Sequence, residues 1–246
     1  MNVKDIKEKE RNFREKDRPF EEFTVATKTK WWSLIELNQV CASIQSANGI
    51  NLLDIGCSDG RLLEYLYKKN PQNNLYGIDF AHNPLKALQQ KTMESYPVCG
   101  DISSLPYKDQ SFQYAVAIQV IQQIPTRNER QKVLRDIHRV LAMNGRFILT
   151  VLNQKIWAHL VENGKEGPLK TARDLHVYLY NPEDLRSEMN AAGFSVERIV
   201  GINHLPVRHI KKLKGLSLFA DRLINIIWPT FSLKKGCYLL AVCQKK

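Results

Sequence analysis

Small and acidic residues gather in one turn early in the chain, where residues 54–60 read Asp-Ile-Gly-Cys-Ser-Asp-Gly. Leu52 and Leu53 precede this turn, and leucines at helical spacing follow it, so we expect a strand, a tight turn and the start of a helix. Such a turn lets backbone N–H groups approach a ligand closely. Asp54 would lie at the carboxyl end of the strand, where open α/β sheets bind ligands, and a cationic ligand group would serve as its partner. A tight turn without a ligand is the alternative interpretation.

Two further acidic residues follow predicted strands. Asp79 closes the apolar segment 75–78, 25 positions after Asp54, and an acid there can accept hydrogen bonds from both hydroxyls of a ribose. Asp101 follows the short strand predicted at 96–99. The dinucleotide-binding pattern Gly-x-Gly-x-x-Gly is absent because position 58 is Ser.

These features resemble the motifs of class I S-adenosylmethionine-dependent methyltransferases, type 11 branch, whose first motif runs Asp/Glu-x-Gly-x-Gly-x-Gly. Residues 105–112 (Leu-Pro-Tyr-Lys-Asp-Gln-Ser-Phe) and 139–146 (Arg-Val-Leu-Ala-Met-Asn-Gly-Arg) are similar to later motifs of that family. The resemblance implies S-adenosylmethionine as cofactor. It also implies a set of cofactor-binding residues, namely Asp54, Gly56, Cys57, Ser58, Gly60, Asp79, Phe80, Asp101, Ile102 and Gln119.

The chain departs from the family pattern at three places. Ser58 replaces the middle glycine of the first motif, and Asn144 replaces a usual proline. Residues 119–123 read Gln-Val-Ile-Gln-Gln where many relatives have paired histidines. Because amides do not titrate, these glutamines are not useful general bases, although Gln119 can still face the methionine part of the cofactor.

Strands that alternate with helices predict an α/β fold with a doubly wound, mainly parallel sheet. The resemblance further implies that this sheet has seven strands in a Rossmann-like arrangement, with helices on both of its faces. We expect strands at 50–55, 75–79, 96–99, 112–120, 146–152, 194–200 and 237–243, and helices at 29–46, 60–69, 84–91, 127–141 and 182–192, with a turn at 144–145.

Three regions are expected within this organisation. Residues 1–48 form a charged N-terminal arm and a helix, a possible cap, with Phe13, Phe20 and Phe23 packed against the body. Residues 49–202 form the cofactor-binding core. Residues 203–246 form a basic and apolar cap segment followed by the final strand.

Composition excludes several classes of protein. The chain has 246 residues, of which 43% are hydrophobic and 25% charged, as is ordinary for a soluble globular protein. No run of about 18 apolar residues occurs, so we expect no membrane span. The five cysteines are odd in number and lack a Cys-x-x-Cys pair, and the N-terminus lacks an apolar signal core. We therefore expect reduced thiols, a cytoplasmic location and no metal site.

The net charge of +11 is concentrated near the C-terminus, where residues 198–246 carry ten Lys and Arg against one acid, Asp221, which is +9. Such a segment attracts phosphate-bearing substrates, nucleic acid or an anionic membrane, or simply forms a solvated face. Residues 216–231 are mostly apolar. These residues could line a lipophilic pocket, or they could touch a membrane beside Lys211, Lys212 and Lys214. The preferred interpretation is an ordinary packed helix.

The resemblance implies methyl transfer to an O, N or C nucleophile of a small molecule, and an anionic or a lipophilic molecule would suit the C-terminal segment. A tRNA substrate is the less favoured alternative, and a non-catalytic methyltransferase-like scaffold is the other. The intact acids and Gly56 argue against a scaffold. Candidates for a general base are His176, Tyr178, Tyr180 and His204, although a lone His is more often a packed residue. The acceptor and the oligomeric state stay open.

Overall fold

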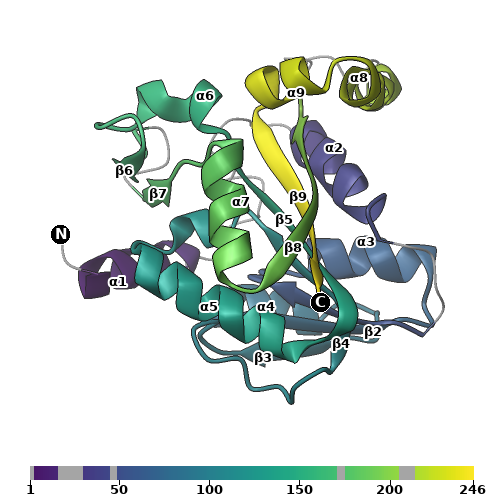
Figure 1. The fold of residues 1–246 in the computed structure, drawn as a ribbon. Helices are drawn as coiled ribbons and strands as arrows, with labels where there is room; N and C mark the ends of the chain where they lie inside the picture. Colours follow the sequence, from purple (N-terminus) through teal and green to yellow (C-terminus); the bar gives the residue numbers. More distant parts are fainter. Residues whose placement is uncertain (1–2, 16–29, 45–48, 171–174, 205–213) are drawn as a thin grey trace.

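A seven-stranded sheet runs through the computed structural model, which describes residues 3–15, 30–44, 49–170, 175–204 and 214–246 (Figure 1). The strand order is β3-β2-β1-β4-β5-β9-β8. The first five strands of that order are parallel, and β9 pairs antiparallel with both β5 and β8. The mainly parallel seven-stranded fold is therefore confirmed. The strands are β1 (Asn51–Ile55), β2 (Asn74–Asp79), β3 (Tyr96–Cys99), β4 (Phe112–Ile118), β5 (Leu141–Leu152), β8 (Phe194–Ile202) and β9 (Tyr238–Lys245).

Each face of the sheet has its own hydrophobic core. Leu52 and Leu53 are adjacent in β1 and fully buried, yet they belong to different cores because successive side chains of a strand point to opposite faces. One core includes side chains of α2 (Lys30–Cys41), α3 (Arg61–Lys69) and α4 (His82–Gln89). The other includes side chains of α5 (Arg127–Val140) and α7 (Pro182–Ala191). Helices on both faces leave the carboxyl ends of the parallel strands to bind ligands.

Several element ends differ from the predicted ones. β4 ends at Ile118 because Gln119 adopts a left-handed backbone (φ 58°). β5 begins at Leu141, before the turn expected at 144–145, and its register with β4 is irregular there. Asn144 has φ 62° and accommodates this irregularity within the strand. α4 begins at His82, two residues before Pro84.

A small antiparallel pair between β5 and α7 was not predicted. It consists of β6 (Glu166–Pro168) and β7 (His176–Tyr178), and it follows α6 (Gln154–Trp157) and the short turns of 3-10 helix at Ala158–Leu160. Another such turn, η2 (Ile121–Gln123), follows β4. Three-residue strands carry too little alternation to be recognised in the sequence.

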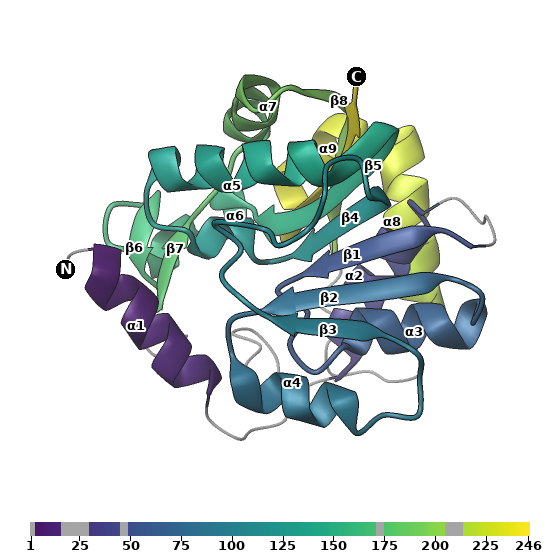
Figure 2. The ribbon, with the colours of Figure 1, turned by 90° about the horizontal axis from the view of Figure 1, so that it is seen from below.

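The N-terminal segment forms the helix α1 (Val3–Arg14). Phe13 is 9% exposed and packs against the body as expected, whereas Phe20 and Phe23 lie outside the described residues. In Figure 2 α1 lies across the edge at which the arrowheads of β1, β2 and β3 end.

The C-terminal apolar segment forms α8 (Lys214–Ile227) and α9 (Pro229–Lys235). α8 contacts α2, α9 and β8, but the preferred interpretation of an ordinary packed helix does not hold for the whole segment, because Phe219, Ile226 and Trp228 are 61%, 79% and 59% exposed. Lys211 and Lys212 lie outside the described residues. Among the described helices, none is both long and apolar enough to cross a membrane.

Candidate active site

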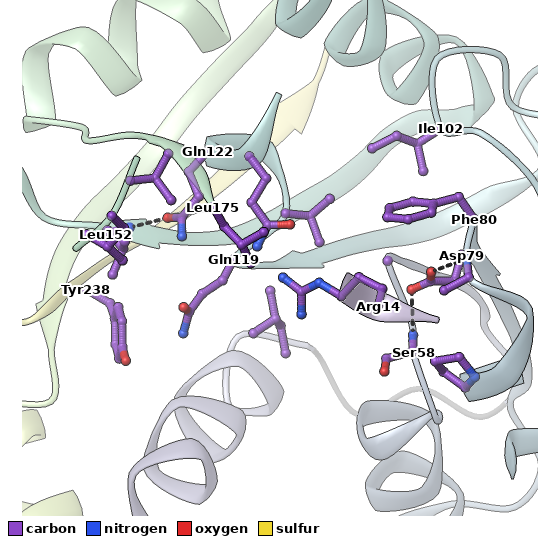
Figure 3. A pocket seen from close by; sticks show the side chains of 18 residues that line it. Arg14, Ser58, Asp79, Phe80, Ile102, Gln119, Gln122, Leu152, Leu175 and Tyr238 are labelled. Carbon is purple, nitrogen blue, oxygen red and sulfur yellow. Dashed lines mark hydrogen bonds between the residues drawn. The ribbon is translucent and has the colours of Figure 1, made fainter. Parts of the chain in front are cut away.

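A cavity opens at the carboxyl ends of β1, β2 and β4, and we call it the inner cavity (Figure 3). Ser58, Asp79 and Phe80 line one end of it. Leu152 and Tyr238 lie at the opposite end, with Gln119 and Arg14 between the two. This is the edge at which a doubly wound sheet binds ligands.

The turn after β1 has the conformation that its glycines permit. Gly56 and Gly60 have φ of 72° and 76°, and Ser58 has φ 50°. A Cβ at Gly56 would lie 2.5 Å from Cγ2 of Val120, so no larger residue fits without a shift of that side chain. The Gly56 N–H donates to the Ile78 carbonyl at 2.7 Å, which ties the turn to β2. Gly56 and Ser58 line the inner cavity, so backbone lies directly against it.

Asp79 links the turn to the end of β2. Its Oδ2 accepts the Ser58 N–H and its Oδ1 accepts the Ala81 N–H, both at 2.9 Å. Burial raises the pKa of this 8% exposed carboxyl group, and these two hydrogen bonds and the charge of Arg14 oppose the rise. Each carboxylate oxygen keeps a second lone pair, so the group can still accept two hydroxyl donors.

A second, outer cavity of about 440 Å³ lies under α1. Phe80, Ile102 and Val120 line both cavities, and Asp101 lines the outer one. Asp101 Oδ1 accepts the Ser103 N–H at 2.8 Å. Partial burial would raise its pKa, but the Ser103 hydrogen bonds and the nearby charges of α1 hold that pKa below its usual value. The volume is in the range of small-molecule sites, roughly 300–1,000 Å³.

Helix α1 covers the outer cavity, and specific contacts hold the helix in place. The Glu15 carboxylate accepts the backbone N–H groups of His82 at 2.8 Å and Asn83 at 3.1 Å, at the start of α4. Lys7 Nζ lies 2.8 Å from an oxygen of Glu129. Because Glu15 directly follows α1 and Lys7 lies within it, these contacts hold both parts of α1 against the core.

The predicted acids converge only in part. Asp79 and Asp101 reach the two adjoining cavities, but Asp54 is 4% exposed and lies behind the lining. Burial raises the pKa of Asp54 to about 8, and the positive charge of Arg61 opposes this rise more than any other group. Arg61 therefore supplies within the chain the positive neighbour that the sequence analysis assigned to a ligand. Cys57 and Gly60, also predicted for the cofactor, shape the turn without lining either cavity.

A buried acid that the sequence analysis missed positions Gln119. Glu36 of α2 is 1% exposed, and its two oxygens accept Gln119 Nε2 at 3.0 and 2.9 Å. Thr150 Oγ1 donates to the same carboxylate at 2.6 Å. Burial raises the pKa of Glu36 in spite of these donors and the charge of Arg61. The available signal was a single acid within the apolar run 34–37 of a helix.

The end of the inner cavity beyond Gln119 is mostly apolar. Its wall comes from β5, from the segment around β6 and β7, and from the start of β9, through Leu152, Leu169, Leu175, Val177 and Tyr238. The sequence analysis assigned none of these residues to the site. They are separated by up to 86 positions, and no local motif marks them.

The four candidates for a general base do not line either cavity. Tyr180 is fully buried, and its hydroxyl donates to Glu188 at 2.7 Å. The Arg130 guanidinium lies 4.0 Å from the centre of the Tyr178 ring. His204 Nε2 lies 3.1 Å from the Ser232 hydroxyl.

His176 occupies β7 between Leu175 and Val177. Because its two neighbours line the cavity, His176 projects to the other side of the strand. Among the residues that the structure describes, no three His, Cys, Asp or Glu side chains are grouped to hold a metal ion.

Comparison with known proteins agrees with this geometry. Residues 53–149 match a family described as a methyltransferase domain, of type 11. Residues 53–149 therefore belong to a methyltransferase domain of the type 11 branch, and the seven-stranded fold is that of S-adenosylmethionine-dependent methyltransferases.

Relatives that share this domain are named for different kinds of substrate. A demethylmenaquinone methyltransferase of Thermotoga maritima is 27% identical over 68% of this chain and 78% of its own length. A tRNA (carboxymethyluridine(34)-5-O)-methyltransferase of Arabidopsis thaliana is 30% identical over 46% of this chain, which is only 27% of that protein. A Thermotoga maritima structure described as a possible histamine N-methyltransferase superposes with a TM-score of 0.68 at 16% identity, over 95% and 98% of the two chains, and shows the shared fold.

The residues present fit the cofactor that the family implies. Asp79 retains lone pairs for ribose hydroxyls, and the apolar side chains of Phe80 and Ile102 line the cavities next to Asp101. The narrow glycine turn leaves backbone facing the cavity where a larger side chain would clash.

Proposed function

We propose that this methyltransferase transfers a methyl group to a small molecule with an apolar body. The observation that carries the proposal is the acceptor end of the inner cavity, where Leu152, Leu169, Leu175 and Val177 gather beyond Gln119. Binding sites for small molecules are mostly apolar with few polar groups, as here. S-adenosylmethionine supplies an already activated methyl group when bound.

We assign the cofactor's binding to two groups of residues. Asp79 and Asp101 would hold the ribose and the adenine, with Phe80 and Ile102 against the ring. Gly56, Ser58 and Gln119 would face the methionine part, because they line the stretch between Asp79 and the apolar end. The chain's contribution is to orient the two reactants and to exclude water, and orientation can contribute about 7–11 kcal/mol to lowering a barrier.

The acceptor should carry a nucleophile that needs no general base. Among the described residues that line the inner cavity, the titratable side chains are Arg14, Asp79 and Tyr238. Asp79 is held by two backbone donors at the opposite end of the cavity, and Arg14 cannot accept a proton. An acceptor that is ionised or has a free lone pair at neutral pH suits this lining.

A tRNA substrate is the second candidate, favoured by the +9 charge of residues 198–246 and by the Arabidopsis relative. The described part of that segment places α8 and α9 outside the lining of both cavities. Tight retention of tRNA that weakens steeply with salt would support this candidate.

Calorimetry with S-adenosylhomocysteine tests the cofactor site. Asp79→Ala should weaken binding at least about fivefold, because charge-assisted hydrogen bonds are lost. Asp109→Ala is the matched control, since Asp109 pairs with Arg139 outside both cavities. Unchanged affinity in Asp79→Ala would remove Asp79 from the site.

Transfer of a radioactive methyl group to apolar small molecules, with total tRNA in parallel, tests the acceptor class. Leu175→Trp, which fills the acceptor end, should abolish transfer to the small molecule and leave the affinity for S-adenosylhomocysteine within about twofold. Methylation of tRNA alone, unaffected by Leu175→Trp, would refute the proposal.

A further inference from the structure

Helix α8 exposes four large apolar side chains to solvent. Phe219, Leu223, Ile226 and Ile227 follow the spacing i, i+4, i+7, i+8, which places them on one face of a helix. Their exposed fractions are 61%, 41%, 79% and 51%. The polar residue Asn225 instead points inward and accepts a hydrogen bond from the Ser232 hydroxyl of α9. A helix that packed all its apolar side chains on a soluble core would not expose these four.

The apolar face continues beyond the end of α8. Trp228, between the two helices, is 59% exposed, and Phe231 of α9 is 46% exposed. We call these two residues and the four of α8 the C-terminal apolar face. In the described part of the chain, the remaining exposed large apolar side chains are Tyr96 and Met143. Six of the eight such side chains therefore lie within residues 219–231, and exposed apolar side chains gathered in this way mark an interaction site.

The C-terminal apolar face is separate from the active site. Figures 1 and 2 both place α8 at the opposite side of the molecule from α1, which roofs the outer cavity. No described residue of α8 or α9 lines the inner or the outer cavity. Binding of the cofactor or the acceptor does not account for its exposure.

Positive charge accompanies this face. Lys234 and Lys235 end α9, and both are exposed one turn after Phe231. In the sequence, residues 208–235 carry seven Lys and Arg against Asp221, a net charge of +6. Aliphatic residues, Phe and Trp beside clustered Lys are the composition of helices that lie in the plane of a membrane surface.

We propose that α8 and α9 bind this methyltransferase to the surface of an anionic membrane. The six side chains of the C-terminal apolar face enter the boundary between head groups and acyl chains, and the flanking lysines contact acidic head groups. Trp228 suits that boundary because its ring is apolar and its N–H can meet polar groups.

The charge of this segment favours an anionic membrane over a second copy of the chain or nucleic acid as the partner of the C-terminal apolar face. A second copy of the chain would bring a second strongly positive segment to the same interface, and like charges there oppose association. Nucleic acid would use the lysines, but it would leave the aliphatic Leu223, Ile226 and Ile227 without a role, since bases stack on aromatic rings. An anionic bilayer matches both the apolar face and the charge.

Sedimentation of the full chain with vesicles tests the proposal. We expect binding to phosphatidylcholine vesicles containing about one-third phosphatidylglycerol, much weaker binding to phosphatidylcholine alone, and a loss of binding as salt rises. Ile226→Ser should weaken binding at least about fivefold, since a buried aliphatic side chain is lost from the interface. Lys234→Gln with Lys235→Gln should weaken it at least about fivefold through the charge.

Met143→Ser is the matched control, because Met143 is 55% exposed and lies on β5, outside the C-terminal apolar face. It should bind vesicles as the unaltered chain does, and every variant should keep its affinity for S-adenosylhomocysteine. Equal binding to neutral and anionic vesicles, or binding to neither, would overturn the proposal. Dimerisation that Ile226→Ser abolishes, without vesicle binding, would assign the face to a second copy instead. Retention of tRNA that depends on the lysines but not on Ile226 would also overturn the proposal.

Discussion

Glu36→Gln tests whether the buried acid of α2 sets the orientation of Gln119. Both oxygens of the Glu36 carboxyl group accept from Nε2 of Gln119, at 3.0 and 2.9 Å, so the NH₂ group of Gln119 faces Glu36. The amide oxygen of Gln119 is then left for the cavity that Gln119 lines. A glutamine at position 36 has both a donor and an acceptor, so it can hold Gln119 in either orientation.

The magnitude follows from the bonds involved. A hydrogen bond to a charged group contributes about 1.5–3 kcal/mol and a neutral one about 0.5–1.5 kcal/mol. If the amide oxygen of Gln119 meets the ammonium group of the cofactor, losing part of that contact costs about 1.4 kcal/mol, which is about tenfold in affinity. We therefore expect Glu36→Gln to raise the dissociation constant of S-adenosylhomocysteine about tenfold.

Calorimetry at neutral pH, with thermal unfolding in parallel, measures the two effects separately. Thr150→Val is the control, because it removes the hydroxyl that bonds Glu36 at 2.6 Å and leaves Gln119 in contact with the carboxylate. Its effect on affinity should be within about threefold. If Glu36→Gln lowers the melting temperature but binds S-adenosylhomocysteine as tightly as the unaltered chain, Glu36 has a structural role only and the reasoning is refuted.

Three further substitutions test the electrostatics and strain of the core. Because burial raises the pKa of Asp54 from 3.8 to about 8, the folded state holds a proton that the unfolded state releases, so stability should fall as pH rises from about 4 to 8, by several kcal/mol. Asp54→Asn should flatten that pH profile in thermal unfolding, and an unchanged slope would contradict the shift. Ser58→Gly should raise stability by up to about 1 kcal/mol in urea unfolding, because the φ of 50° then costs nothing; a loss of stability would show that the Ser58 side chain is needed. Glu188→Ala should cost about 3–5 kcal/mol in the same assay by leaving the buried Arg130 guanidinium, 2.7 Å from Glu188, without its partner, and a change under about 1 kcal/mol would refute this.

The framework of the fold could be predicted because local signals set it. The apolar run of β1, the small residues after it and the leucines of α3 are contiguous, so each element is readable within a dozen residues. Asp79 was predictable for the same reason, since it ends a strand whose pattern is clear. Its two hydrogen bonds to Ser58 and Ala81 then follow from the position of that strand beside β1.

The acceptor end could not be predicted because the residues that line it lie far apart in the sequence. Leu169 and Tyr238 meet at one cavity only after β9 inserts between β5 and β8, which brings the start of the last strand beside the end of β5. Neither residue belongs to a recognisable pattern before that insertion. Glu36 was missed for a related reason, as its partners Gln119 and Thr150 lie 83 and 114 positions away.

The same contrast explains why the two ends of the inner cavity differ in chemistry. At the cofactor end, Gly56, Ser58 and Asp79 lie at the ends of adjacent strands, and the hydrogen bonds of Gly56 to Ile78 and of Ser58 to Asp79 link β1 with β2. At the acceptor end, Leu169 and Leu175 flank the small β6–β7 pair, which forms a separate sheet from the seven-stranded one. Substitutions there alter the shape of the cavity without breaking the seven-stranded sheet. The fold therefore fixes the end of the cavity that we propose for the cofactor, whereas the acceptor end can change its shape while the seven-stranded sheet stays intact.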